Sequence, residues 1–249
     1  MYRHQGKART MKDNLRIAII LSFVAGIVNV TGFLFLKQLT TNVTGHFALF
    51  INDVANLEFW KGTVYFLYIF SFLLGSFASS FLIEFFRNNK RLNVYVIPVI
   101  IESLILIFVA ILGSIYLFEY PDLIACLLLF SMGLQNSYVT KVSDAVVRTT
   151  HLTGLFTDLG IELSYLFFKK KYPNRKKIKA SIKLRIYIIS FFFLGGLFGG
   201  FAYSTLQLGM YTLIIGAAVL IFNLLYDDMR FRVINLRRKS YRRRIAYRK

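Results

Sequence analysis

The sequence has few of the residues that build disulfide scaffolds and soluble enzyme sites. It contains one cysteine, Cys126, so no intramolecular disulfide can form. It has only three histidines, and the P-loop, CxxC, HExxH and GxSxG motifs do not occur. These absences exclude a small disulfide-stabilised domain and argue against the common enzyme classes. We therefore expect no enzymatic activity, no cofactor and no metal site.

Acidic residues are also scarce. The chain has 12 Asp and Glu residues against 31 Lys and Arg residues, which gives a formal net charge of +19. In a soluble protein such an excess indicates nucleic-acid binding, but no aromatic-interleaved recognition module accompanies the basic segments at 169–185 and 230–249. Lys and Arg residues that flank membrane helices bind anionic lipid. We therefore expect the lipid bilayer, and no nucleic acid, as the partner of these segments.

Long uncharged apolar runs are abundant and place the chain among membrane proteins. Hydrophobic residues make up 56% of the sequence, more than one soluble core of this length needs. A membrane-spanning helix needs about 20 apolar residues, and we expect six spans: Ile17–Leu36, Gly62–Phe85, Leu92–Phe118, Leu123–Val139 and two within Ile186–Tyr226. The last run would be roughly 60 Å long as one helix. We therefore predict that it folds back at Tyr203 to Gly209.

The sequence is internally duplicated. A first Thr-Gly motif, Thr40 to His46 (TTNVTGH), is echoed 109 positions downstream by a second Thr-Gly motif, Thr149 to Leu155 (TTHLTGL). Flanking blocks match in the same order: Gly26 to Asn29 with Gly133 to Asn136, Phe72 to Gly75 with Phe192 to Gly195, and Phe81 with Phe201. Three matched blocks in one order indicate a repeat. We divide the chain into a basic leader (1–16), a first half (17–118), a second half (119–228) and a basic tail (229–249).

The distribution of positive charge distinguishes two topologies. In the first, each Thr-Gly motif begins a short segment that dips into the membrane and returns, which gives six spans. This topology places 29 of the 31 Lys and Arg residues in the cytoplasm, as the positive-inside rule favours. In the second, both segments cross fully, which gives eight spans and several exposed positive charges outside. The six-span topology fits better, and the eight-span topology stays open.

On the six-span topology the two halves are inverted relative to each other. We therefore predict an all-α integral membrane protein of six transmembrane helices plus two re-entrant half-helices, built as an inverted 3+3 repeat. Both termini lie in the cytoplasm, and the protein resides in the bacterial inner (plasma) membrane. The two Thr-Gly motifs then enter from opposite faces and meet near mid-depth, as in many solute carriers.

The Thr-Gly motifs and two matched asparagines supply the candidate solute-binding residues. Threonine and asparagine side chains can cap the following helix or bind a solute, and Gly45 and Gly154 permit a tight turn or close backbone approach. The candidates are Asn29, Asn42, Thr44, Gly45, His46, Asn136, Thr149, Thr150, His151, Thr153 and Gly154. The alternative interpretation is that the motifs are ordinary interfacial loops and that Asn29 and Asn136 join helices by hydrogen bonds.

Ionisable residues within membrane segments are candidates for charge coupling. They are Asp158, Glu162, Glu102 and Arg148. Asp158 and Glu162 lie one helical turn apart, so they take part either in a proton relay with His151 or in salt bridges to Arg148 or Lys141. Glu102 is either functional or simply paired. Separately, the glycine and serine runs at residues 75–80 and 195–200 predict close helix packing.

At these residues the sequence resembles the YoaK family of bacterial multi-pass membrane proteins, over roughly Leu15 to Tyr226. The resemblance rests on Gly26 to Asn29, Thr44-Gly45, Gly133 to Asn136, and the run Arg148 to Gly154 with Asp158 behind it. This chain departs from the family pattern at Asn29, where the family usually has Asp, and at His46, where it usually has Asn. The resemblance implies a membrane location and leaves the activity open.

The leading functional hypothesis is a transporter or channel for a small polar or anionic solute, with its site between the two Thr-Gly motifs. The alternative is a membrane scaffold or partner-binding subunit that does not transport. A homo-oligomer is compatible with either. The solute, the direction of transport and the coupling ion are not encoded in any recognisable pattern.

Overall fold

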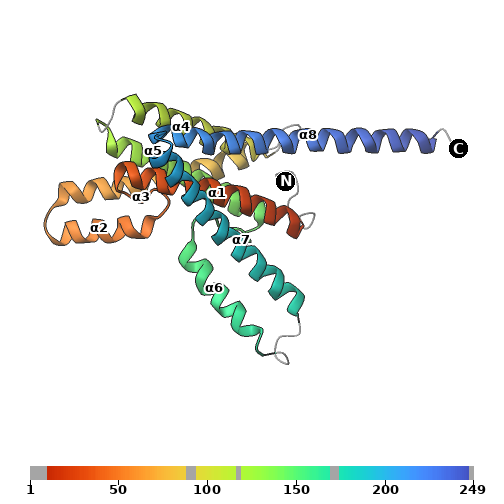
Figure 1. Cartoon of the computed structure of the whole chain (residues 1–249), viewed down its shortest axis with the longest axis horizontal. Helices are drawn as coiled ribbons and strands as arrows, with labels where there is room; N and C mark the ends of the chain where they lie inside the picture. Colours follow the sequence, from red (N-terminus) through yellow and green to blue (C-terminus); the bar gives the residue numbers. More distant parts are fainter. Residues whose placement is uncertain (1–9, 88–93, 116–118, 169–173, 247–249) are drawn as a thin grey trace.

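The computed structural model describes residues 10–87, 94–115, 119–168 and 174–246, with side chains as far as residue 229, and these residues are almost entirely helical (Figure 1). The long and short helices follow in chain order: α1 Met11–Leu36, α2 Val43–Ala55, α3 Phe59–Phe85, α4 Val96–Ile115, α5 Pro121–Ser143, α6 Leu152–Tyr165, α7 Arg175–Gly200 and α8 Thr212–Ala246. A π-helix, Phe201–Thr205, and a 3₁₀ turn, Gly209–Tyr211, separate α7 from α8.

Six of these helices are long and apolar enough to cross a membrane, which is the number expected from the sequence. The predicted reversal at Tyr203 to Gly209 is confirmed, since α7 and α8 meet there. Two segments differ from expectation. α7 begins at Arg175, so much of the predicted basic loop is helical, and α8 continues through the basic tail to Ala246. Lys and Arg are good helix formers, so both helices continue past their apolar stretches.

The helix pairs that pack most extensively are α1 with α7 and α3 with α5. The first half contains α1 to α4 and the second half contains α5 to α8. Each pair therefore joins the first helix of one half to the third helix of the other half. Glycines bring these helices into backbone contact, because a Cβ atom built at Gly75 would lie 2.0 Å from the carbonyl oxygen of Phe130. A Cβ atom at Gly195 would lie equally close, 2.0 Å, to the carbonyl oxygen of Phe23. The predicted role of the small residues in helix packing is therefore confirmed.

The matched glycines Gly26 and Gly133 make the reciprocal contacts. A Cβ atom at Gly26 would lie 2.1 Å from the carbonyl oxygen of Phe192, and one at Gly133 would lie 2.2 Å from that of Phe72. Phe72 and Phe192 are themselves matched positions in the duplication. The two main helix contacts therefore use equivalent residues, as expected when a duplicated chain packs against itself.

After α1 the chain reverses and runs back along the helix it has just left. Lys37 ends α1 in the left-handed conformation (φ 58°), which is a common way to stop a helix. Thr40 Oγ1 then donates to the carbonyl oxygen of Val28 at 3.1 Å, and Thr41 Oγ1 donates to Asn29 Oδ1 at 2.8 Å. Asn29 lies about 10 Å before the end of α1 at a rise of 1.5 Å per residue. The start of α2 is thereby held part of the way down the bundle.

The second half repeats this reversal. Asp144 ends α5 in the left-handed conformation (φ 55°). Thr150 Oγ1 donates to Asn136 Oδ1 at 2.9 Å, which is the counterpart of the Thr41 to Asn29 bond. Thr149 Oγ1 accepts a hydrogen bond from Gln135 Nε2 at 3.0 Å. Both short helices, α2 and α6, therefore begin beside the first helix of their own half, after a buried or half-buried pair of threonines.

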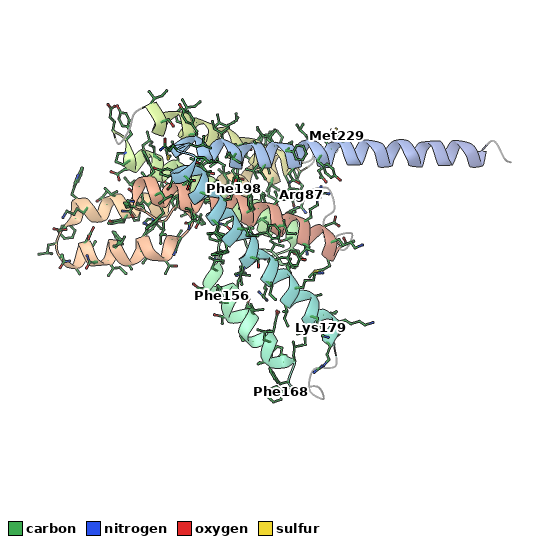
Figure 2. The ribbon with its side chains drawn as sticks, in the orientation of Figure 1. Arg87, Phe156, Phe168, Lys179, Phe198 and Met229 are labelled. Atoms are coloured by element: carbon green, nitrogen blue, oxygen red, sulfur yellow. The ribbon has the colours of Figure 1, made fainter. Side chains whose placement is uncertain are left out.

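The two short helices lead away from the centre in different directions (Figure 1). α2 runs with the start of α3 toward the left end of the bundle in this view, while α6 runs with the start of α7 toward the bottom. The first turns of α1 lie beside α8, since the Arg16 guanidinium sits 4.4 Å from the ring centre of Tyr226. Apolar side chains such as Phe156, Phe168 and Phe198 are exposed on the outside (Figure 2). A lipid environment accommodates such a surface.

Candidate functional site

A cavity of about 910 Å³ lies where the two short helices begin. Five consecutive residues of each Thr-Gly motif line it, Thr41 to Gly45 from the first half and Thr150 to Gly154 from the second. Its remaining walls come from α1, α2, α3, α7 and the approach to α2: Asn29, Leu39, Ala48, Ile69, Phe72, Leu73, Ser76 and Phe192. We call it the central cavity. The two motifs, more than one hundred residues apart in sequence, therefore meet at one place.

The N-terminal ends of α2 and α6, which lie at the central cavity, are capped differently. At α2 the side-chain oxygen of Asn42 accepts hydrogen bonds from the backbone N–H groups of Thr44, at 2.8 Å, and Gly45, at 3.4 Å. At α6 the equivalent position is His151, which makes no side-chain cap bond. The predicted capping role is therefore confirmed for Asn42 in the first motif, while the threonines of the second motif do not cap α6. The N–H groups at the start of α6 lack the side-chain acceptor that α2 has.

The motif glycines have a different role from the predicted one. Neither Gly45 nor Gly154 is in a positive-φ turn, and both lie in the first turn of their helices. A Cβ atom at Gly154 would meet nothing within 4 Å, and one at Gly45 would lie 3.7 Å from the nearest atom, in Leu39. The predicted tight turn is therefore wrong for both glycines, while close approach of their backbone to a solute stays a prediction. The missing side chains instead leave the central cavity open at both helix ends.

The matched asparagines lie at different depths. Asn29 lines the central cavity, and its side-chain oxygen accepts from Thr41. Asn136 is buried behind Thr150, and its Nδ2 atom has no partner among the described residues. Thr149 is fully buried and bonded to Gln135, so it supports the motif from behind. Each asparagine bonds a threonine in the connecting segment of its own half, and neither of these bonds joins two helices as the alternative interpretation expected.

His46 does not line the central cavity. Its ring is buried against α3, 5.1 Å from the ring centre of Tyr68 and 6.1 Å from that of Tyr65. Its Nε2 atom donates to the carbonyl oxygen of Leu39 at 2.7 Å, so the ring also pins the segment that precedes α2. The position of His46 on the helix turns it away from the cavity that Gly45 faces, because neighbouring helical residues point about 100° apart.

A second, smaller cavity of about 330 Å³ lies beside α6 and α7, and we call it the side cavity. It is lined by Ala145, Val146, Arg148, His151, Gly154, Leu155, Asp158, Ser181, Leu184 and Arg185. Two of the predicted charged residues, Arg148 and Asp158, therefore lie at the side cavity. Among the described residues, no group of three or more His, Cys, Asp or Glu side chains could hold a metal ion.

Arg185 is the partner of the acidic pair on α6. Its guanidinium donates to Asp158 Oδ2 at 2.9 Å and to both oxygens of Glu162, at 3.0 Å and 3.1 Å. The predicted partners Arg148 and Lys141 were wrong for these acids. Lys141 instead bonds Glu84 on α3 at 2.9 Å. Asp158 and Glu162 pair with Arg185 because α6 packs against α7 and because α7 is already helical at residue 185.

We expect loss of the Arg185 charge to loosen α6 from α7. The side chains of Arg185 and Glu162 are only 20% and 16% exposed, so Arg185→Gln leaves a mostly buried carboxylate without a counter-charge, although the Ser181 hydroxyl still donates to it. The expected cost is about 2 kcal/mol of stability. Thermal unfolding of the purified protein would measure it. The double variant with Glu162→Gln should recover part of the loss, because the unpaired charge is removed as well. Additive losses would show that the two residues do not interact.

Glu102 is fully buried in α4 and accepts a hydrogen bond from the Tyr138 hydroxyl at 2.7 Å. Its other carboxyl oxygen, Oε1, has no partner among the described residues. Glu102 lines neither the central nor the side cavity. The structure therefore gives Glu102 a hydrogen-bond partner, Tyr138, and its role in charge coupling stays a prediction.

Sequence reasoning missed several residues that shape the two cavities. Phe72 and Phe192 carry apolar walls of the central cavity, and Ser76 lies beside them. Their matched positions were used only as evidence of the duplication, and neither residue was considered as a candidate lining residue. Arg185 was counted among loop charges. Its place immediately before the uncharged run that starts at Ile186 was the available signal that it belongs to the membrane helix.

Comparison with known proteins supports the resemblance found in the sequence. A family model described as "Protein of unknown function (DUF1275)" matches residues 17–226. Neither a curated protein nor a solved structure matches the chain. The matched segment contains both Thr-Gly motifs and most of all six candidate spans. Because the match covers well over half of its length, the chain belongs to this YoaK-like family of multi-pass membrane proteins of unknown function.

Proposed function

We propose that the protein is a transporter or channel for a small anionic solute, and that the solute binds in the central cavity. The supporting observation is that the same five positions of both Thr-Gly motifs line one cavity of about 910 Å³. Ligand sites commonly have volumes of about 300–1,000 Å³ and combine apolar walls with a few convergent polar groups. Threonine hydroxyls and helix N–H groups provide those polar groups here.

The electrostatics of the helix ends favour a negative charge. The N-terminal end of a helix carries a partial positive charge, and its first N–H groups are free to donate. α6 has no side-chain cap, so its first turn offers donors that α2 already uses with Asn42. Arg148 and His151 lie near this end. An anion in the central cavity would therefore meet donors at α6 and hydroxyls from both motifs.

The proposed arrangement in the membrane is an inverted 3+3 repeat. α1, α3 and α4 belong to the first half, and α5, α7 and α8 to the second. The matched contacts of α1 with α7 and of α3 with α5 support this arrangement. The reversals after α1 and α5 support re-entrant segments. With the positive-inside rule, both termini lie in the cytoplasm and the protein resides in the inner membrane.

The proposal predicts that two threonine hydroxyls contribute directly to solute passage. Thr44 and Thr153 are exposed to the central cavity and occupy equivalent positions in the two motifs. Replacement by the near-isosteric valine removes a donor without adding volume. Each hydroxyl is expected to be worth about 1 kcal/mol, or about fivefold in flux. The double variant Thr44→Val, Thr153→Val should therefore lose more flux than either single variant.

The measurement uses proteoliposomes loaded in turn with chloride, nitrate, phosphate, formate and acetate. The expected result is that the wild-type protein moves at least one of these anions well above protein-free liposomes. Thr157→Val is the matched control, because Thr157 lies on α6, bonds the Thr153 carbonyl oxygen within the helix and does not line the central cavity. Transport of none of these anions, or full activity of the double variant, would favour the alternative of a scaffold or partner-binding subunit.

A further inference from the structure

The central and side cavities share two lining residues. His151 and Gly154, at the start of α6, line both. The cavities therefore adjoin at this helix end. The side cavity continues from there along the α6–α7 pair to Ser181 and Arg185. Its lining residues on α6 and α7 thus extend in the direction in which α6 leaves the centre of the bundle (Figure 1).

In the first half, aromatic side chains fill the position that corresponds to the side cavity. With the spacing of 109 positions between the motifs, Leu155 at the side cavity corresponds to His46. With the spacing of 120 positions between α3 and α7, Arg185 corresponds to Tyr65. In the first half, His46 packs against Tyr65 and is hydrogen bonded to the Leu39 carbonyl oxygen. The same place in the second half is therefore a cavity rather than a packed aromatic cluster.

Further contacts hold the aromatic cluster of the first half in place. The Tyr68 hydroxyl donates to the Asp122 carboxylate on α5, and the rings of Tyr65 and Tyr68 meet edge to face at 5.8 Å. In the second half, position 188 is isoleucine, which offers no equivalent bond. The two halves thus differ at this position, because an aromatic cluster fills it in the first half and the side cavity occupies it in the second.

One charged residue at the side cavity has no oppositely charged partner among the described residues. Asp158 and Arg185 bind each other, and Glu162 accepts the remaining guanidinium bonds of Arg185. Arg148 also lines the side cavity, and no hydrogen bond or ion pair joins its side chain to the other described residues. Its positive charge therefore stays available to a solute.

We propose that the side cavity is the vestibule through which a small anion reaches the central cavity, and that Arg148 selects for negative charge there. This inference rests on the proposed function and adds the access route and the residue that discriminates by charge. A fixed positive charge beside a narrow route raises the local concentration of anions and lowers that of cations.

Cysteine modification tests the vestibule without any need for transport. In full-length protein with Cys126→Ser, reconstituted in lipid nanodiscs, Gly154→Cys and Gly45→Cys each place a thiol in the central cavity, where a Cβ atom has room. The probes are methanethiosulfonates of similar size, one with an anionic ethylsulfonate group and one with a cationic trimethylammonium group. Rates are normalised to those with free 2-mercaptoethanol. The anionic probe is expected to react about tenfold faster than the cationic probe at both thiols.

Substitutions of the vestibule identify the route and the selecting residue. Arg148→Gln should abolish the preference for the anionic probe, whereas Arg148→Lys should retain it. Val146→Trp, at an exposed residue that lines only the side cavity, should slow both probes at both thiols by about tenfold through steric obstruction. Gel filtration checks that each variant is folded.

Two results would overturn the proposal. An unchanged probe preference in Arg148→Gln would show that Arg148 does not select for charge. Unchanged modification rates in Val146→Trp would show that solutes reach the central cavity by another route. Neither result depends on flux, so the vestibule and the transport function can fail separately. A protein that transports no anion could still admit the anionic probe selectively.

Discussion

Gly75→Ala and Gly195→Ala are expected to prevent stable packing of the helix bundle. In an ordinary helix position, alanine is more favourable than glycine by about 1 kcal/mol. At these two positions a Cβ atom would lie 2.0 Å from a backbone carbonyl oxygen of the opposite helix. No side-chain rotation can relieve an overlap with backbone, so the two helices must separate. Insertion of a group into a close-packed interface costs about 3 kcal/mol or more in such a case.

The measurement is the yield of monodisperse protein and its thermal unfolding temperature in a fixed detergent. Gly160→Ala is the matched control, because Gly160 is also helical and a Cβ atom there would meet nothing within 4 Å. The control should unfold at or slightly above the wild-type temperature. If Gly75→Ala and Gly195→Ala behave like the control, α1 with α7 and α3 with α5 do not pack as closely as described.

Gly154→Leu is expected to abolish anion flux while the protein remains folded. Gly154 lines both the central and the side cavity, and a Cβ atom there would meet nothing within 4 Å. A leucine side chain can therefore enter the open space without displacing the backbone. It would obstruct the route and cover the first-turn N–H groups of α6. We expect flux of any transported anion to fall by at least about tenfold, as for an obstructed pore.

The control for this prediction is Gly160→Leu on the same helix. Gly160 lies outside both cavities, so the added side chain faces the exposed surface of α6. Equal helix propensity changes at the two positions cancel in the comparison. Flux would be measured in proteoliposomes containing equal amounts of folded protein. Normal flux through Gly154→Leu would place the solute route elsewhere and would remove α6 from it.

Much of the candidate site could be predicted from the sequence because the two Thr-Gly motifs are repeated. A motif that is repeated in the sequence is expected to take equivalent positions in the two halves of the fold. This reasoning correctly predicted that Thr44 and Thr153 lie at the same cavity. His46 was wrongly included, because sequence distance alone does not give the direction in which a helical residue points. The partner of Asp158 was also missed. Arg185 lies 27 residues away, so their contact depends on how α6 lies against α7.

The sequence by itself determined the class of protein, the six apolar helices and the duplication. These properties depend on local composition and length, because an apolar stretch of about 20 residues partitions into lipid whatever its neighbours are. Only the tertiary structure decided which polar groups face a cavity and which pair with each other. Those outcomes depend on the rotation and depth of each helix, which the backbone contacts of Gly75 and Gly195 fix. The filled place at His46 and the open one at Leu155 therefore follow from packing.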